Sequence, residues 1–186
     1  MQQLLIDLQY LPPISYFVLL AQYHKVVIES GDSFNKSTYR NRCYIAGPHG
    51  ALRLTIPVLG GKSHRMYYRD TQIAYEQDWQ KNHWQSLCSC YRSSPYFEFY
   101  EDRIATFYEQ HYTYLYEFNH SLLMLIIELL GFDIAIDYTD EYHKTFSQGD
   151  DYRDTILPDA GKADKQPQIE LPVYHQVFEN KTGFLR

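Results

Sequence analysis

Three segments in the first half of the chain carry side chains that could bind or transform a small molecule. The first spans residues 9–17 and supplies an amide, Gln9, and two phenols, Tyr10 and Tyr16. Such groups donate and accept hydrogen bonds, and tyrosine rings also stack on flat ligand surfaces. The segment follows an expected strand and precedes an expected helix, which is where open α/β sheets bind ligands. A rigid proline turn with core aromatic residues is the alternative interpretation.

The second segment is a polar loop that concentrates cationic and amide side chains. Its candidate ligand-binding residues are Lys36, Tyr39, Arg40, Asn41 and Arg42. Arginine presents a planar fork of donors to phosphate or carboxylate, and lysine presents a point charge. The loop therefore predicts a site for a phosphate-bearing small ligand. A solvated loop whose charges form surface ion pairs is the alternative.

The third segment places a histidine between two tryptophans. His83 lies one helical turn after Trp79 and directly before Trp84, so the side chains of Trp79 and His83 can meet on one helix face. Histidine titrates near neutral pH, and packing against tryptophan tunes that titration. We therefore consider His83 as a general base and Trp79 and Trp84 as substrate-binding residues. A structural histidine with satisfied hydrogen bonds is the alternative.

The elements that must position these segments predict an α/β fold. Short apolar runs at 4–6 and 26–28 flank a helical stretch at 14–23, which predicts a right-handed β-loop-α-β unit with parallel strands. Residues 42–46 and 51–59 flank a Gly-Pro-His-Gly turn, and the second arm alternates apolar with polar residues, as in a hairpin. We expect a short mixed sheet containing all of these strands, with a further strand at 71–75.

Helical periodicity begins near residue 77 and predicts three helices covering the sheet in the C-terminal half. The first runs for about four turns. The second starts with Ser94 as N-cap and Pro95 in its first turn and ends near residue 110. The third starts near Leu115 and stops at Gly131.

Composition along the chain predicts three parts. Residues 1–136 form a single α/β domain, residues 137–172 an acidic mobile loop or lid, and residues 173–186 a C-terminal segment that docks back on the domain.

Charge and composition exclude several classes of function. The 186 residues include 17 Lys and Arg against 23 Asp and Glu, and a net charge of -6 argues against nucleic-acid binding. No apolar run approaches the roughly 20 residues of a membrane span, and no signal peptide is visible, so we expect a cytoplasmic protein. The three cysteines and eight histidines lack metal-ligand spacing, so no metal site is expected, and the cofactor is unknown.

The three segments, in this order and spacing, resemble the WbqC-like protein family, which is bacterial and poorly characterised. The resemblance rests on residues 9–17, 39–42, 54–58, 94–97, 174–178 and 183–185 together with Trp79, His83 and Trp84. Some members are encoded among genes for surface-polysaccharide biosynthesis, which implies work on activated sugars or their acyl groups. Many relatives carry a histidine where this chain has Leu8, and relatives continue beyond Arg186, which leaves truncation an open question.

Two functions from different classes stay open. The first is a transferase-type enzyme acting on a phosphate-bearing small molecule such as an activated sugar. In that case the cationic loop would bind the phosphate, Tyr10 and Tyr16 the base or sugar, and His83 would act as general base. The alternative is a non-catalytic binding or assembly protein that engages a partner enzyme through a surface rich in tyrosine, of which the chain has 19.

Overall fold

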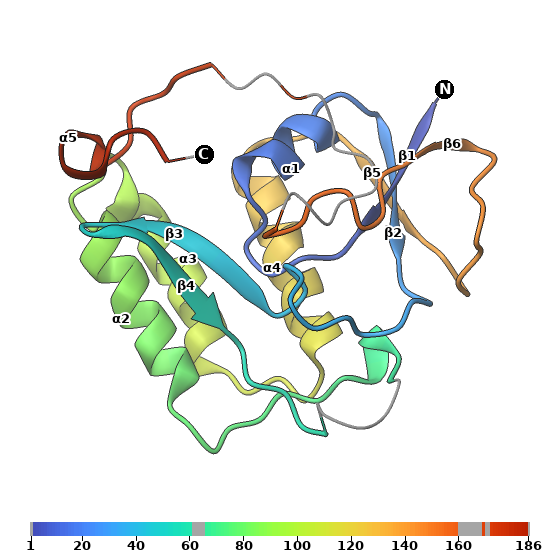
Figure 1. The fold of residues 1–186 in the computed structure, drawn as a ribbon, viewed down its shortest axis with the longest axis horizontal. Helices are drawn as coiled ribbons and strands as arrows, with labels where there is room; N and C mark the ends of the chain where they lie inside the picture. The colour runs from blue at the N-terminus through green and yellow to red at the C-terminus, as the bar shows by residue number, and fades with distance from the viewer. Residues whose placement is uncertain (1, 61–65, 160–168, 170–171, 186) are drawn as a thin grey trace.

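The fold is built on a four-stranded parallel sheet, seen in a computed structural model that describes residues 2–60, 66–159, 169 and 172–185 (Figure 1). Its strands are β1 (Gln3–Asp7), β2 (Lys25–Glu29), β5 (Ala135–Tyr138) and β6 (Gly149–Asp151), in the order β5-β2-β1-β6. Each neighbouring pair is parallel. The carboxyl ends of all four strands therefore meet at one edge of the sheet.

The opening β-α-β unit agrees with the prediction from sequence. Helix α1 (Ile14–Leu20) connects β1 to β2, and Pro13 precedes its first turn. The strands are short and almost wholly buried, in the register Leu4↔Val26 to Asp7↔Glu29. Apolar side chains at successive positions suit a parallel strand because both of its faces are covered.

The predicted hairpin is present, but it forms a sheet of its own. Strands β3 (Arg42–Gly47) and β4 (Gly50–Thr55) pair antiparallel around a turn in which Gly50 has φ +114. The expected α/β class with a β-α-β start and a hairpin is confirmed, but the hairpin does not join the parallel sheet, because β2 is already paired with β5 and β1 with β6. The two strands nearest the hairpin in sequence therefore have no free edge to offer it.

The three helices expected from periodicity are present: α2 (Trp79–Tyr91), which begins before the midpoint of the chain, and α3 (Phe97–Glu109) and α4 (Leu115–Leu129) in the C-terminal half. Figure 1 shows α2 and α3 beside the hairpin and α4 nearer the parallel sheet. Phe118 of α4 joins the layers, since its ring contacts Tyr10, Trp79 and Tyr108 at centroid distances of 5.7–6.3 Å. One aromatic cluster thus connects the segment after β1 with helices α2, α3 and α4.

Some predicted boundaries differ from those observed. Helix α3 begins at Phe97, two residues after Pro95, because Tyr96 adopts a left-handed conformation with φ 66 and breaks the helix there. Residues 71–75 contribute isolated bridges rather than a strand. Gly131 ends α4 with φ +66, as the sequence indicates.

The acidic segment expected to be a mobile loop or lid takes part in the parallel sheet. Residues 149–151 form β6 on β1, and β5 ends inside the segment at Tyr138. Residues 160–168, 170 and 171 of the segment lie outside the described residues. In the C-terminal part, α5 (Glu179–Thr182) follows Phe178, whose side chain packs against the core.

No helix in the described part of the chain is long and apolar enough to cross a membrane. All three cysteines are free thiols, with Cys43 and Cys90 buried.

Candidate functional site

Acidic side chains end three of the four parallel strands. Asp7 is the last residue of β1, Glu29 of β2 and Asp151 of β6, and Asp7 and Glu29 are almost fully buried. In open α/β sheets ligands bind in the crevice outside the carboxyl ends of the strands. Burying carboxylates at this edge requires cationic partners, which two arginines supply.

Arg40 is the first of these partners and holds three carboxylates on one nitrogen. Its Nη2 lies 2.8 Å from Asp7 Oδ1, 2.6 Å from Asp32 Oδ2 and 3.6 Å from Asp154 Oδ1. Its Nη1 donates to the carbonyl of Ser33 at 3.1 Å, and its side chain is 3% exposed. Although burial opposes the charge, the carboxylates hold the pKa of Arg40 above its usual value. The guanidinium is therefore engaged within the fold rather than presented to solvent.

Asp154 is the most exposed carboxylate of this cluster, and its titration is displaced towards neutrality. Its backbone N–H donates to Asp7 Oδ2 at 2.6 Å, and its side chain is 54% exposed. Burial of the carboxyl group and the charge of Asp7 raise the pKa of Asp154 to about 6, against the opposing effect of Arg40. A carboxyl group with such a pKa exchanges a proton readily near neutral pH, which is what a general acid or base needs.

Arg153 is the second partner. Its Nε and Nη2 form a bidentate pair with Asp151, and its Nη1 donates to Glu29 Oε2 at 2.8 Å and to the carbonyl of His143 at 2.8 Å. The same guanidinium lies over the ring of Tyr142, 4.8 Å from its centroid. Arg153 thus ties the residues after β5 to the ends of β2 and β6.

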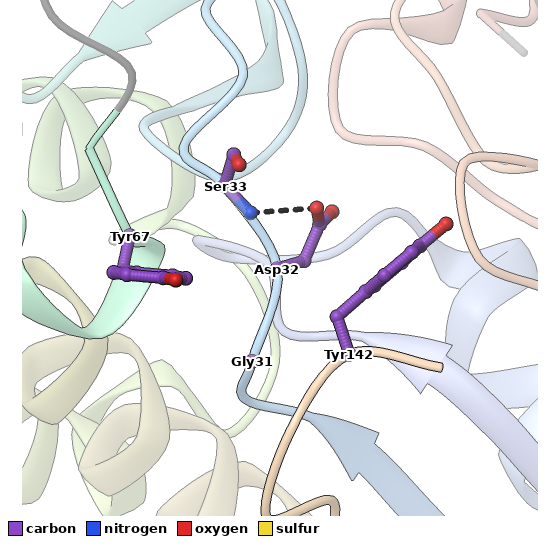
Figure 2. A pocket seen from close by; sticks show the side chains of 5 residues that line it. All are labelled: Gly31, Asp32, Ser33, Tyr67 and Tyr142. Carbon is purple, nitrogen blue, oxygen red and sulfur yellow. Dashed lines mark hydrogen bonds between the residues drawn. The ribbon is translucent and has the colours of Figure 1, made fainter. Parts of the chain in front are cut away.

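A pocket of about 420 Å³ opens beside this network and is lined by Gly31, Asp32, Ser33, Tyr67 and Tyr142. Figure 2 shows the two tyrosines on opposite sides of segment 31–33, where the N–H of Ser33 donates to Asp32 Oδ1 at 2.6 Å. Tyr67 and Tyr142 are 55% and 50% exposed, so their rings are accessible to a ligand.

Two contacts fix the walls of this pocket. A Cβ added to Gly31 would lie 2.3 Å from the backbone nitrogen of Tyr142, so glycine is required for the close approach of the two segments. On the other side, the guanidinium of Arg69 lies over the ring of Tyr67 at 5.6 Å.

A neighbouring pocket of about 600 Å³ lies across segment 139–142. Leu5 and Val27 of the sheet line it, together with Glu29, Asp140 and Arg153. Arg153 thus lines this second cavity and also contacts Tyr142, which lines the first.

The structure places Tyr10 and His83 together in the core, apart from the carboxylate network. The Tyr10 hydroxyl lies 2.9 Å from His83 Nδ1 and 2.9 Å from the hydroxyl of Tyr108. Burial lowers the pKa of His83 to about 4, against an opposing hydrogen bond to the backbone of Thr55. His83 is 5% exposed and neutral at pH 7, so its geometry fits a structural hydrogen-bond acceptor better than a base in contact with substrate.

Other residues predicted for the site are also structural in their contacts. Tyr16 is buried and donates to the carbonyl of Asp7 at 3.0 Å, and buried Asn41 donates to the carbonyl of Ile56 at 2.9 Å. Gln9 donates to the carbonyl of Ile156 at 3.1 Å, which places it near Asp154.

The remaining predicted residues lie in the loop before the hairpin, in the hairpin and in helix α2. The Tyr39 carbonyl accepts from the backbone of Tyr10 at 2.8 Å, Arg42 is half-buried, and Trp84 stacks on Tyr108 with centroids 5.7 Å apart. Lys36 is exposed in the loop after β2. Of the predicted residues, Arg40 is the one that the structure joins to the carboxylate network by ion pairs.

The sequence interpretation missed the carboxylates and the pocket walls: Asp7, Asp32, Asp154, Tyr67, Arg69 and Tyr142. Asp7 and Glu29 had a visible signal, since each directly follows an apolar strand and carboxyl ends of parallel strands share an edge. Asp32 and Asp154 had none, because their meeting at Arg40 depends on long-range packing. Within the described ranges, no group of three His, Cys, Asp or Glu side chains could hold a metal ion.

The sequence profile of the WbqC-like protein family matches residues 9–164, which is most of the chain. The chain belongs to the WbqC-like family. Among curated proteins, the WbqC-like chain is 30% identical over 140 residues to "Uncharacterized protein Rv1507c" of Mycobacterium tuberculosis. That alignment covers 74% of this chain and 60% of the relative, so the chain spans less than two-thirds of the relative's length. No solved structure matches this chain.

The match to the WbqC-like family includes most of the network and pocket at the carboxyl ends of the parallel strands, called the carboxyl-end site below. Asp32, Arg40, Tyr67, Tyr142 and Asp154 all lie within the matched residues.

Proposed function

We propose that this WbqC-like chain is a transferase-type enzyme that acts on a phosphate-bearing small molecule such as an activated sugar. The observation that supports this proposal is the convergence of Asp7, Asp32 and Asp154 on Arg40 beside a pocket at the carboxyl ends of parallel strands. A carboxyl group whose pKa is raised towards neutrality, as that of Asp154 is, is typical of acid-base sites.

Residues that line the pocket and residues beside it have distinct roles in this proposal. The sugar ring lies between Tyr67 and Tyr142, and Arg69 binds the phosphate at the Tyr67 end. Asp154 removes the proton from an acceptor hydroxyl, whose oxygen bonds to the donor carbon as the phosphate leaves with its bonding electrons. Arg40 is a positioning residue that keeps the carboxylates in place.

The proposal relocates the site from its sequence-based position. Arg40 is surrounded by carboxylates, so it has little capacity left for a phosphate, and His83 is enclosed in the core. Among the described residues no carboxylate pairs with Arg69, which makes it the better phosphate ligand at this edge.

Binding is tested by thermal unfolding with nucleotide-sugars, sugar phosphates, acyl-CoA and inorganic phosphate. A ligand at 100 times its dissociation constant adds about 2.7 kcal/mol to the free energy of unfolding. We expect a sugar-phosphate ligand to stabilise the protein, and Arg69→Gln to weaken that binding at least tenfold. Arg103→Gln, on the exposed side of α3, is the matched control.

Catalysis is tested with the ligand so found. Activity of the wild type should rise with pH through about 6 as Asp154 ionises, and Asp154→Asn should abolish turnover while leaving ligand binding intact. The proposal would be contradicted if no ligand of the panel stabilised the folded protein against thermal unfolding, or if Asp154→Asn retained full activity.

A second function, protein-partner binding, is favoured by a different surface. Helices α2, α3 and α4 enclose an apolar groove of about 360 Å³, lined by Trp84, Leu87, Tyr91, Phe97, Tyr100, Ile104, Ile126, Leu129 and Leu130. Phe99 and Tyr96 beside it are each 69% exposed. Exposed apolar surface of this kind marks interaction sites. Loss of a captured partner on Phe99→Ser, with no ligand response in the wild type, would support this function instead.

A further inference from the structure

The carboxyl-end site has an excess of negative charge at its Tyr142 end. Five acidic side chains share two arginines there: Asp7, Asp32 and Asp154 with Arg40, and Glu29 and Asp151 with Arg153. Both guanidiniums are nearly buried, with side chains 3% and 7% exposed, and each already contacts at least two carboxylates. This end of the pocket therefore disfavours an anionic group and favours a cationic one.

The Tyr67 end has the opposite character. The guanidinium of exposed Arg69 lies over the ring of Tyr67. None of the carboxylates in the described part of the chain forms an ion pair with this guanidinium. A guanidinium lies over each tyrosine, but Arg153 at Tyr142 is already paired with Glu29 and Asp151, whereas Arg69 at Tyr67 pairs with no carboxylate in the described part of the chain. The unbalanced charge is therefore positive beside Tyr67 and negative at Asp32, which lines the pocket. A ligand that complements both ends carries an anion and a cation separated by about the width of the pocket.

The carboxylate that faces the pocket is Asp32. It lines the cavity, and its side chain is 20% exposed even though Oδ2 bonds to Arg40 and Oδ1 accepts from Ser33. Each carboxylate oxygen can accept more than one hydrogen bond, so both oxygens can still receive a donor from a ligand. A charged donor is preferred over a neutral one because charge-assisted hydrogen bonds are about twice as strong.

The size and walls of the cavity limit the ligand further. A volume of about 420 Å³ is at the small end of ligand pockets, which suits one sugar ring with its substituents. Two accessible tyrosine rings can hold the apolar face of such a ring and also attract a cation near it.

We infer that the substrate moiety bound between Tyr67 and Tyr142 carries a protonated amino group directed at Asp32, so that the substrate is an amino sugar phosphate. This inference rests on the proposed function and names its substrate class. The amino group lies at the acidic end and the phosphate at Arg69.

The test compares matched ligands on the wild-type protein by isothermal titration calorimetry at pH 7. The probes are glucosamine 1-phosphate, glucose 1-phosphate and N-acetylglucosamine 1-phosphate, which differ in the charge of one substituent. We expect the amino form to bind at least tenfold more tightly than the other two, a difference of about 1.4 kcal/mol. Equal affinities, or a preference for the N-acetyl form, would overturn the inference and leave the proposed function standing.

Asp32→Asn should remove the preference for the amino form while retaining binding of glucose 1-phosphate. Asp140→Asn is the matched control, because Asp140 lines the neighbouring cavity and not this one. If Asp32→Asn fails to fold, the wild-type comparison still decides. A wild-type preference that Asp32→Asn leaves unchanged would overturn the assignment of the amino group to Asp32.

Two further probes separate this inference from the proposed function. Glucosamine and glucose lack the phosphate, so a preference for glucosamine supports the amino site even if the phosphate adds no affinity. Failure of all five probes to bind would overturn this inference, and the proposed function would fall with it only if the nucleotide-sugars of the thermal-unfolding panel also failed to bind.

Discussion

Replacing Arg40 by methionine is the most direct test of the carboxylate network. Methionine retains much of the volume of the side chain and removes the charge and its hydrogen bonds. The substitution leaves Asp7, whose side chain is 5% exposed, and Asp32 without their cation, and it removes the hydrogen bond from Arg40 to the carbonyl of Ser33. Removing one member of a buried ion pair costs about 3–5 kcal/mol, because a buried charge is left uncompensated.

Such a loss is large beside the roughly 5–15 kcal/mol that stabilises a typical domain. We expect the melting temperature of Arg40→Met to fall by roughly 10 °C, and its urea midpoint to fall accordingly. The tryptophans Trp79 and Trp84 report unfolding by fluorescence from within the core and beside it. At acidic pH the cost should shrink, because protons neutralise the carboxylates that the substitution leaves unpaired.

Arg103→Met is the matched control. Arg103 pairs with Glu128 at 2.9 Å, but the two side chains are 47% and 66% exposed, and such surface pairs contribute about 0–1 kcal/mol. A loss for Arg40→Met no larger than that of Arg103→Met would refute the interpretation of Arg40 as a buried structural cation. It would also restore Arg40 as a candidate phosphate ligand.

Three further predictions concern pH and packing. The folded pKa of His83, about 4, lies below its ordinary value of 6.5, so the free energy of unfolding should decline as pH falls through this window, and His83→Gln should flatten that decline in urea titrations. The folded pKa of Asp154 is instead raised from 3.8 to about 6, so stability is lost as pH rises through that range, and Asp154→Asn should be more stable than wild type at pH 7 but not at pH 3. Gly31→Ala should cost about 1–3 kcal/mol by displacing the backbone of Tyr142, and should weaken ligand binding in calorimetry. Gly60→Ala, where the added Cβ meets no atom but φ is +68, should cost about 1 kcal/mol through left-handed backbone strain and leave binding unchanged.

Sequence patterns within short windows predicted the elements that such windows specify. The β-α-β unit, the hairpin and the three helices follow from apolar spacing and turn residues within short windows. Strand β6 could not be predicted, because Gly149, Asp150 and Asp151 have no strand propensity and pair only where β1 offers an edge.

The site shows the same division between local and long-range information. The cation-rich loop that contains Arg40 was visible in the sequence, but what the guanidinium binds was not. Asp7, Asp32 and Asp154 reach it from three separate parts of the chain. Tyr10 and His83 were predicted as neighbours of one site and are hydrogen-bonded to each other, yet core packing encloses them. Spacing along the sequence therefore indicated proximity, whereas exposure was decided by the tertiary structure.

The pairing of β1 with β6 has a consequence for how the protein is made. Gln3 pairs with Gly149, so β1 leaves the ribosome well before β6, the strand that covers its second edge. Until then β1 and β2 present an apolar ribbon with an open backbone edge, which other chains can extend. The same late pairing brings Asp154 to Asp7, so assembly of the site and protection of the nascent strand are completed in one step. Variants that weaken β6 should therefore reduce the yield of native protein during synthesis more than their effect on the finished fold would suggest.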